Sequence, residues 1–190
     1  VLWYGWEQTW SLNELPNALI LCSDIPWVDA DGERFEAEGE LFGWWKAGPS
    51  YWAVWSQDQI DGIAENGFSS NLSTLAAGNQ GLMPGNMPVP EIYDVLDKLV
   101  AQGYVVKADT YEELAQQMGV DPATFVKTME DYASYCETGV DEQFGKAAEK
   151  LVVPGNGPFY ALKGYSAAFA TNGGLDINEK FEVLQDDGET

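Results

Sequence analysis

Acidic side chains dominate the groups that could do chemistry in this sequence of 190 residues. The chain has 31 Asp and Glu against nine Lys and Arg, and it has no His. Without histidine, the chain itself cannot supply a His-based triad, a His-ligated metal site or a histidine general base. Glu112 and Glu113, like Glu130 and Asp131, are adjacent on expected helices, so they do not face each other as a catalytic pair would. The acidic residues therefore indicate a solvated surface.

The charge and the apolar content exclude several classes of partner. A net charge of -22 repels phosphate backbones and anionic headgroups, so we expect no nucleic-acid binding. No apolar run is long enough to span a bilayer, so we expect no direct membrane insertion. Cys22 and Cys136 lie far apart without CxxC or metal spacing, which favours two buried thiols over a disulfide.

An aromatic cluster in the first third of the chain has two interpretations. Trp44, Trp45, Trp52 and Trp55 lie within a short stretch of sequence. They could line an apolar ligand pocket or build a core, and the residues alone favour the core.

Two adjacent glycines near the end of the chain also leave alternatives open. Gly173 and Gly174 lie between strand-like stretches in the segment TNGGLDIN. Such a pair indicates either backbone with positive φ or a partner that approaches closer than a Cβ permits. From the residues alone, a bulge or a tight turn is slightly favoured.

The elements that must position these residues begin with short extended segments. Residues 29–35 contain an Asp-Gly turn, and residues 51–56 (YWAVWS) have the composition of a strand. Ser56 is the expected N-cap of a short helix over 57–66 that ends at Gly67. The rest of the first third lacks helical periodicity.

The middle third is helical, and its helices carry end signals. Residues 90–103 place four apolar residues on one stripe and end at Gly103. Thr110 and Glu113 form a capping-box pattern at the start of the next helix, and Asp121 is the N-cap of a third. The last third returns to strand-like segments, so the sequence predicts an α+β domain.

Three segments resemble a known family. Residues 32–38 (GERFEAE) resemble the GKRFxNE motif of the fumarate reductase/succinate dehydrogenase flavoprotein family, which includes flavocytochrome-type fumarate reductases and has 3-ketosteroid dehydrogenases as relatives. Residues 108–146, from ADTYEELAQQMGVD to GVDEQFGK, look like one family segment almost throughout. Residues 157–189 resemble the stretch that rejoins the FAD-binding domain. The resemblance covers roughly residue 30 to the end.

The resemblance implies a place within a larger enzyme. Family members carry an FAD-binding domain split around a mobile capping domain, and this chain is similar to the capping domain, with helices packed on a small mixed sheet. Residues 1–29 are expected to form a flanking segment at the edge of the FAD-binding domain or the entry to the cap. Residues 30–166 would form the cap, and residues 167–190 would form truncated strands that return toward the FAD-binding domain.

The resemblance also implies cofactor, partners and activity. The full-length protein is expected to bind FAD and to reduce or desaturate a C=C bond by hydride transfer. The fragment alone is expected to bind no FAD and to be inactive. Its partners would be the remainder of its own FAD-binding domain and a small-molecule substrate. The residues matching the family's flavin-proximal turn are Thr171, Asn172, Gly173 and Gly174.

Two departures from the family pattern argue against fumarate as the substrate. The position of the family's proton-donating Arg falls at about Phe42, and that of its substrate-binding His at about Phe169. A phenyl ring cannot pair with a carboxylate as a guanidinium does, and two unpaired carboxylates in a closed site would cost several kcal/mol. We therefore expect an apolar, aromatic or steroid-like substrate, in a pocket lined by Phe42, Trp44, Trp45 and Phe169. Tyr51 is the first candidate to supply the proton.

Arg34 is the only arginine in the sequence. Because the corresponding family Arg is not the proton donor, we expect a structural ion pair with Glu36 or Glu38. An alternative function remains open, namely a non-catalytic binding or structural domain that has kept the cap fold. The missing Arg and His favour this alternative, and the preserved Thr-x-Gly-Gly turn disfavours it.

Overall fold

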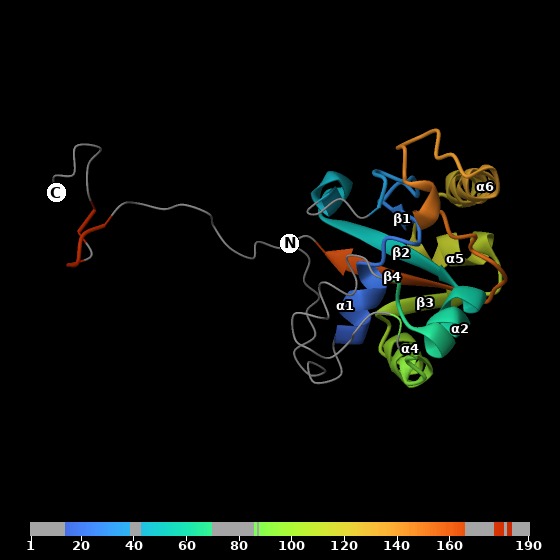
Figure 1. The fold of residues 1–190 in the computed structure, drawn as a ribbon, viewed down its shortest axis with the longest axis horizontal. Helices are drawn as coiled ribbons and strands as arrows, with labels where there is room; N and C mark the ends of the chain where they lie inside the picture. Colours follow the sequence, from blue (N-terminus) through green and yellow to red (C-terminus); the bar gives the residue numbers. More distant parts are fainter. Residues whose placement is uncertain are drawn as a thin grey trace.

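The computed structural model describes residues 14–38, 43–69, 86, 88–165, 177–180 and 182–183. A four-stranded sheet with helices on both faces makes up most of this part of the chain (Figure 1). The elements run in the order α1 (Glu14–Ile20), β1 (Trp27–Val28), η2 (Gly43–Ala47), β2 (Ser50–Ser56), α2 (Gln57–Asn66), α4 (Ile92–Ala101), β3 (Val105–Ala108), α5 (Tyr111–Met118), α6 (Pro122–Thr138), η3 (Ala148–Lys150) and β4 (Phe159–Tyr165).

Every pair of neighbouring strands in this sheet is antiparallel. The strand order is β1-β2-β4-β3, and β2 pairs with β4 from Ser50↔Tyr165 to Ser56↔Phe159. The prediction of a mixed sheet is therefore wrong. Strands β2 and β3 run in the same direction, but β4 lies between them and runs the opposite way, so the two parallel strands never pair. The coarser prediction of helices packed on a small sheet is confirmed.

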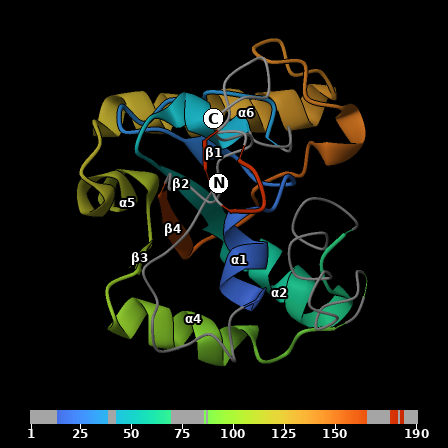
Figure 2. The same cartoon turned by 90° about the vertical axis from the view of Figure 1, so that its left-hand side faces the viewer.

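Side chains on β2 alternate between two separate cores. Tyr51, Ala53 and Trp55 belong to one core, whereas Trp52 and Val54 belong to the other. Helices α1, α2 and α4 cover the first core, and α5 and α6 cover the second (Figure 2). Because β2 is buried on both faces, its sequence is an almost continuous apolar run rather than an alternation of apolar and polar residues.

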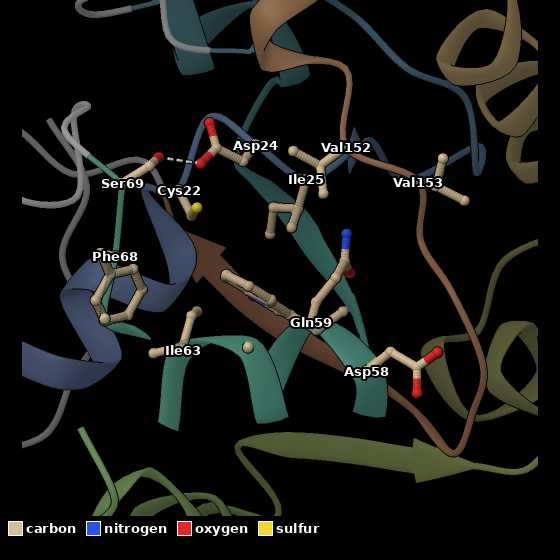
Figure 3. A pocket seen from close by; sticks show the side chains of 13 residues that line it. Cys22, Asp24, Ile25, Asp58, Gln59, Ile63, Phe68, Ser69, Val152 and Val153 are labelled. Carbon is tan, nitrogen blue, oxygen red and sulfur yellow. Dashed lines mark hydrogen bonds between the residues drawn. The ribbon is translucent and has the colours of Figure 1, made fainter. Parts of the chain in front are cut away.

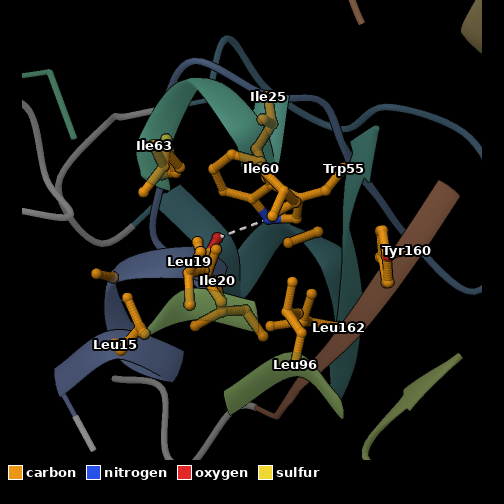
Figure 4. Packing of buried hydrophobic residues seen from close by; sticks show 14 of the residues in the cluster. Leu15, Leu19, Ile20, Ile25, Trp55, Ile60, Ile63, Leu96, Tyr160 and Leu162 are labelled. Atoms are coloured by element: carbon orange, nitrogen blue, oxygen red, sulfur yellow. Dashed lines mark hydrogen bonds between the residues drawn. The ribbon is translucent and has the colours of Figure 1, made fainter. Parts of the chain in front are cut away.

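Two aromatic side chains of β2 tie it to α1. Nε1 of Trp55 donates to the carbonyl oxygen of Leu19 at 3.1 Å, and the hydroxyl of Tyr51 donates to that of Ile20 at 2.9 Å. These bonds satisfy two of the carbonyls that a helix leaves without partners at its C-terminal end. Figure 4 shows Trp55 and Leu19 in the middle of the core formed with α1, α2 and α4.

Helix α1 was not predicted from the sequence. Residues 15, 16 and 18–20 are all buried, and only Asn17 is half-buried between them. A helix that is apolar around most of its surface lacks the period that marks an amphipathic helix. The helix also packs into the same core as strands from the rest of the chain.

The predicted helix starts agree with the structure. Ser56 and Gln59 form a complete capping box at the start of α2. Thr110 accepts the bond from the backbone N–H of Glu113 at 3.2 Å, which confirms the hydroxyl half of the predicted capping box at the start of α5. The carboxylate of Asp121 accepts from the backbone N–H three residues later at 2.8 Å, and this bond lowers the pKa of Asp121.

Neither Cys22 nor Cys136 forms a disulfide, as predicted. Cys22 is buried and Cys136 is half-buried. Among the helices in the described ranges, none is both long and apolar enough to cross a membrane.

Candidate functional site

Most of the predicted substrate and cofactor residues lie outside the part of the chain that the structure describes. This holds for Phe42, Phe169 and residues 171–174, so their roles stay predictions. Trp44 belongs to η2, but its side chain is outside the described set. Trp45, the next residue of η2, is 67% exposed just before β2 begins, where a ligand or another part of the protein could reach it.

Tyr51 occupies a core position. Its ring lies 5.2 Å from that of Trp27 and 5.8 Å from that of Phe35, measured between centroids. Opposite it on β4, a Cβ added to Gly164 would come within 2.9 Å of the Tyr51 ring, so the close packing requires glycine there. Because the hydroxyl donates its proton to the Ile20 carbonyl, a proton-donor role would require this bond to break. That role remains a prediction.

Arg34 lies at the centre of a buried ion network. Nε and one Nη donate to the carboxylate of Glu38 at 2.7 and 2.8 Å, and the two Nη atoms donate to Asp141 at 2.9 and 3.1 Å. Each contact is bidentate, which is the strongest geometry between a guanidinium and a carboxylate. The predicted ion pair with Glu38 is confirmed, and the partner 107 positions away was not predicted.

A second cation completes the network. Nζ of Lys146 lies 3.2 Å from the carboxylate of Glu38 and donates to the hydroxyl of Tyr132 at 2.9 Å. The Tyr132 ring lies under both cations, 5.0 Å from Cζ of Arg34 and 4.9 Å from Nζ of Lys146. Two cations and two carboxylates therefore share one buried space with no net charge. Buried charges are tolerated when they are paired in this way.

The pKa shifts in this network follow from burial and ion pairing. Burial by itself would raise the pKa of Asp141, but hydrogen bonds from Arg34 and from the backbone N–H of Lys146 lower it to about 2. Burial lowers the pKa of Lys146, and the carboxylate of Glu38 opposes this effect. Burial raises the pKa of Tyr132. With a pKa of about 2, Asp141 stays ionised near neutral pH, which fits an anchor for Arg34 rather than an acid–base catalyst.

The network fixes the segment that leads toward the predicted substrate residues. Glu38, at φ 40°, immediately precedes the stretch that contains Phe42. Two residues before it, the buried carboxylate of Glu36 lies 3.6 Å from Nζ of Lys46 on η2, the helix that carries Trp45. The ion pairs thus tie this segment to the turn after α6 and to η2, and the ring of Tyr132 on α6 packs against Arg34.

A cleft of about 300 Å³ lies at the other end of β2. Figure 3 shows side chains from α2, from the segment after α1 and from residues 152–153 around it. Neither Tyr51 nor Trp45 lines this cleft. Sequence analysis did not predict it, and Gly62, an isolated glycine within a predicted helix, was the signal that could have indicated it.

The described residues do not form a metal site or an FAD site on their own. No group of three or more Cys, Asp and Glu side chains in the described ranges is placed to hold a metal ion. FAD-binding domains of the dinucleotide type use a glycine-rich turn between a parallel strand and a helix. Here the sheet is antiparallel, and β2 leads directly into α2 through Ser56 without a glycine.

Comparison with known proteins finds one family model and several similar proteins. A family model described as "FAD binding domain" matches residues 14–190. Vinyl phenol reductase from Lactiplantibacillus plantarum is 31% identical over 169 residues, which are 86% of this chain and 33% of that protein. The chain therefore spans about a third of the length of this relative.

Two solved structures share the fold. A crystal structure of 3-ketosteroid delta1-dehydrogenase from Sterolibacterium denitrificans matches with a TM-score of 0.60 and 20% identity, over 90% of this chain and 32% of that chain. A solution NMR structure of the fumarate reductase flavoprotein subunit from Lactobacillus plantarum matches with a TM-score of 0.53 and 15% identity, over 84% of this chain and 92% of that chain.

The resemblance recognised in the sequence is confirmed by these matches. The chain belongs to the FAD binding domain family of flavoprotein oxidoreductases, and FAD is the cofactor of the full-length protein.

Proposed function

We propose that this chain is the substrate-capping part of a longer flavoprotein that reduces a C=C bond or forms one by desaturation. The similarity to vinyl phenol reductase supports this reaction class, and two solved flavoenzyme structures share the fold. The flavin, held by other parts of the longer protein, supplies the hydride transfer. The role of this chain is to close over the substrate and exclude water.

The pairing of Arg34 within the chain is the observation that supports the proposed substrate class. It is the only arginine in the sequence, it is 3% exposed, and its donors face Glu38 and Asp141. The chain therefore has no guanidinium left for a substrate carboxylate, and it has no histidine. A dicarboxylate bound under this cap would keep costly unpaired charge, so the substrate is an uncharged apolar or aromatic alkene or enone.

Steady-state kinetics of the purified full-length protein test this proposal. Flavin absorbance is measured first, followed by turnover of 4-vinylphenol, a steroid enone and fumarate with a reduced dye. We expect kcat/KM for at least one uncharged substrate to exceed that for fumarate by more than about 100-fold, because unpaired carboxylates cost several kcal/mol.

Two outcomes would contradict the proposal in different ways. Comparable turnover of fumarate would contradict the substrate class while leaving the reaction type in place. A full-length protein without flavin absorbance would instead support the alternative, a non-catalytic binding domain with the cap fold.

A further inference from the structure

The cleft beside α2 has the size and walls of a small-molecule site. Its volume of about 300 Å³ is at the lower end of the range for ligand pockets. A molecule of one or two aromatic rings would fill it. The apolar walls are formed by Ile25, Trp55, Ile63, Phe68, Val152 and Val153.

Gly62 keeps one wall of the cleft open. It lies inside α2, where glycine is less stable than alanine, and its φ is not positive. A Cβ built at Gly62 would meet no described residue within 4 Å. Gly164, by contrast, is required by close packing, because a Cβ there would lie 2.8 Å from the side chain of Ile20. Within the described part of the chain, neither backbone conformation nor packing explains why position 62 is a glycine. The effect of the glycine is to leave this part of the cleft unfilled.

Gln59 provides a hydrogen-bond donor at the cleft. Its Oε1 accepts from the backbone N–H of Ser56 at 3.0 Å and from the Ser56 hydroxyl at 3.2 Å, which fixes the orientation of the amide. Its Nε2 is buried and has no hydrogen-bond partner among the described residues. Figure 3 shows this amide pointing away from α2 toward Ile25 and Val152. A buried donor without a partner is destabilising, and a ligand carrying an acceptor would satisfy it.

The charges around the cleft select against anions. Asp24 and Asp58 both line it. Asp24 accepts from the Ser69 hydroxyl and lies 3.6 Å from Nζ of Lys150, while Asp58 accepts two bonds from Asn156 at 2.8 Å. Both carboxylates are held in place. Among the described residues no cationic side chain lines the cleft, and the chain as a whole is strongly acidic. An anionic ligand would therefore be repelled.

We propose that this cleft binds a small, uncharged aromatic molecule that carries a hydrogen-bond acceptor, with the ring against Trp55 and the acceptor at Nε2 of Gln59. An aromatic amide fits this description, because its carbonyl would accept from Gln59 and its N–H groups could donate to a carboxylate at the rim. The site does not depend on the reaction proposed above.

Binding to the 190-residue chain tests the proposal with two probes of the same shape. 2-Naphthamide is uncharged, and 2-naphthoate is its anionic counterpart. A flavoprotein chain of about this extent has a solution structure, so ligand-observed NMR and calorimetry are practical. With about 13 non-hydrogen atoms, we expect 2-naphthamide to bind with a Kd of about 1 mM or tighter. We expect 2-naphthoate to bind at least tenfold more weakly.

Variants of α2 test whether the ligand binds in the cleft. Gly62→Leu fills the open wall and should weaken 2-naphthamide binding at least tenfold while keeping the fold. Glu65→Leu adds the same side chain at an exposed position of α2 outside the cleft and should leave Kd unchanged. Gln59→Glu keeps an acceptor for Ser56 but removes the donor, and it should also weaken binding at least tenfold. Circular dichroism confirms that each variant is folded.

Three outcomes would overturn the proposal. The first is no binding of 2-naphthamide at millimolar concentration. The second is equal affinity for the amide and the carboxylate. The third is unchanged affinity in a folded Gly62→Leu variant, because the ligand would then bind elsewhere on the chain.

Discussion

Replacing Arg34 by methionine removes one cation from a buried group of two cations and two carboxylates. Arg34, Glu38, Asp141 and Lys146 are each no more than 5% exposed, so solvent cannot take over the lost pairing. Arg34→Met would leave two carboxylates facing one ammonium. Removing one partner of a buried ion pair costs about 3–5 kcal/mol, and we expect the free energy of unfolding to fall by this amount. A domain whose total stability is about 5–15 kcal/mol would then be only marginally folded.

Two further variants separate the charge from the hydrogen bonds. Lys146→Met leaves the same charge imbalance but keeps the four guanidinium bonds of 2.7–3.1 Å, so we expect a smaller loss, about 2–3 kcal/mol. Adding Asp141→Asn to Arg34→Met restores one cation for one carboxylate. The double variant should be at least about 1 kcal/mol more stable than the sum of the two single effects.

Urea denaturation of the same chain, followed by tryptophan fluorescence and by far-ultraviolet circular dichroism, measures these differences. The two probes must give the same midpoint for the free energies to be compared. An Arg34→Met variant within about 1 kcal/mol of the parent would refute the assignment of Arg34 as a structural anchor. Strictly additive effects of Arg34→Met and Asp141→Asn would refute the coupling between them.

Three other substitutions and one pH dependence are predicted by the same structure. The pKa of Asp141, about 2, lies below the ordinary carboxyl value of about 3.9, so its ionised form stabilises the fold above about pH 4. Urea denaturation at a series of pH values should show this stabilisation lost as pH falls toward 2, whereas the Asp141→Asn variant should not show this loss. Gly164→Ala should destabilise by about 1–3 kcal/mol, because the new Cβ would lie 2.9 Å from the Tyr51 ring. Gly62→Ala should instead stabilise by about 0.5–1 kcal/mol, since it removes a helix-interior glycine without a clash, and a fall in its melting temperature would contradict this. Ser56→Ala should cost about 1 kcal/mol through loss of the α2 cap, measured by thermal unfolding.

Local signals in the sequence predicted much of the helical part. Ser56, Thr110 and Asp121 cap the helices they were expected to begin, because a capping side chain bonds to backbone only two or three residues away. The apolar stripe of α6 likewise marks the buried face, with Phe125 and Met129 fully buried. Each of these features is fixed within a few residues of sequence.

Features that depend on distant parts of the chain were not predictable. Asp141 pairs with Arg34 across 107 positions, and no local pattern indicates that contact. The antiparallel pairing of the whole sheet depends on β4 entering between β2 and β3 after more than a hundred residues. Helix α1 is buried around most of its surface, so the usual helical period is absent from its sequence.

Only the site residues that match a family motif could be predicted from the sequence. Phe42, Phe169 and the Gly173-Gly174 pair were assigned by resemblance and lie outside the described residues, so they remain predictions. The cleft at Gly62 and Gln59 was not predicted, because its walls come from three separated segments that only the fold brings together.

Reoxidation of the pre-reduced full-length flavoprotein by single alkenes tests the proposed function most directly. The flavin absorbance is followed by stopped-flow under anaerobic conditions, with 4-vinylphenol, a steroid enone or fumarate as the only oxidant. We predict rapid recovery of oxidised flavin with at least one uncharged alkene and a rate at least about 100-fold lower with fumarate. Equally fast recovery with fumarate would contradict the proposal of a capped flavoenzyme for uncharged C=C substrates. So would the absence of recovery with all three compounds.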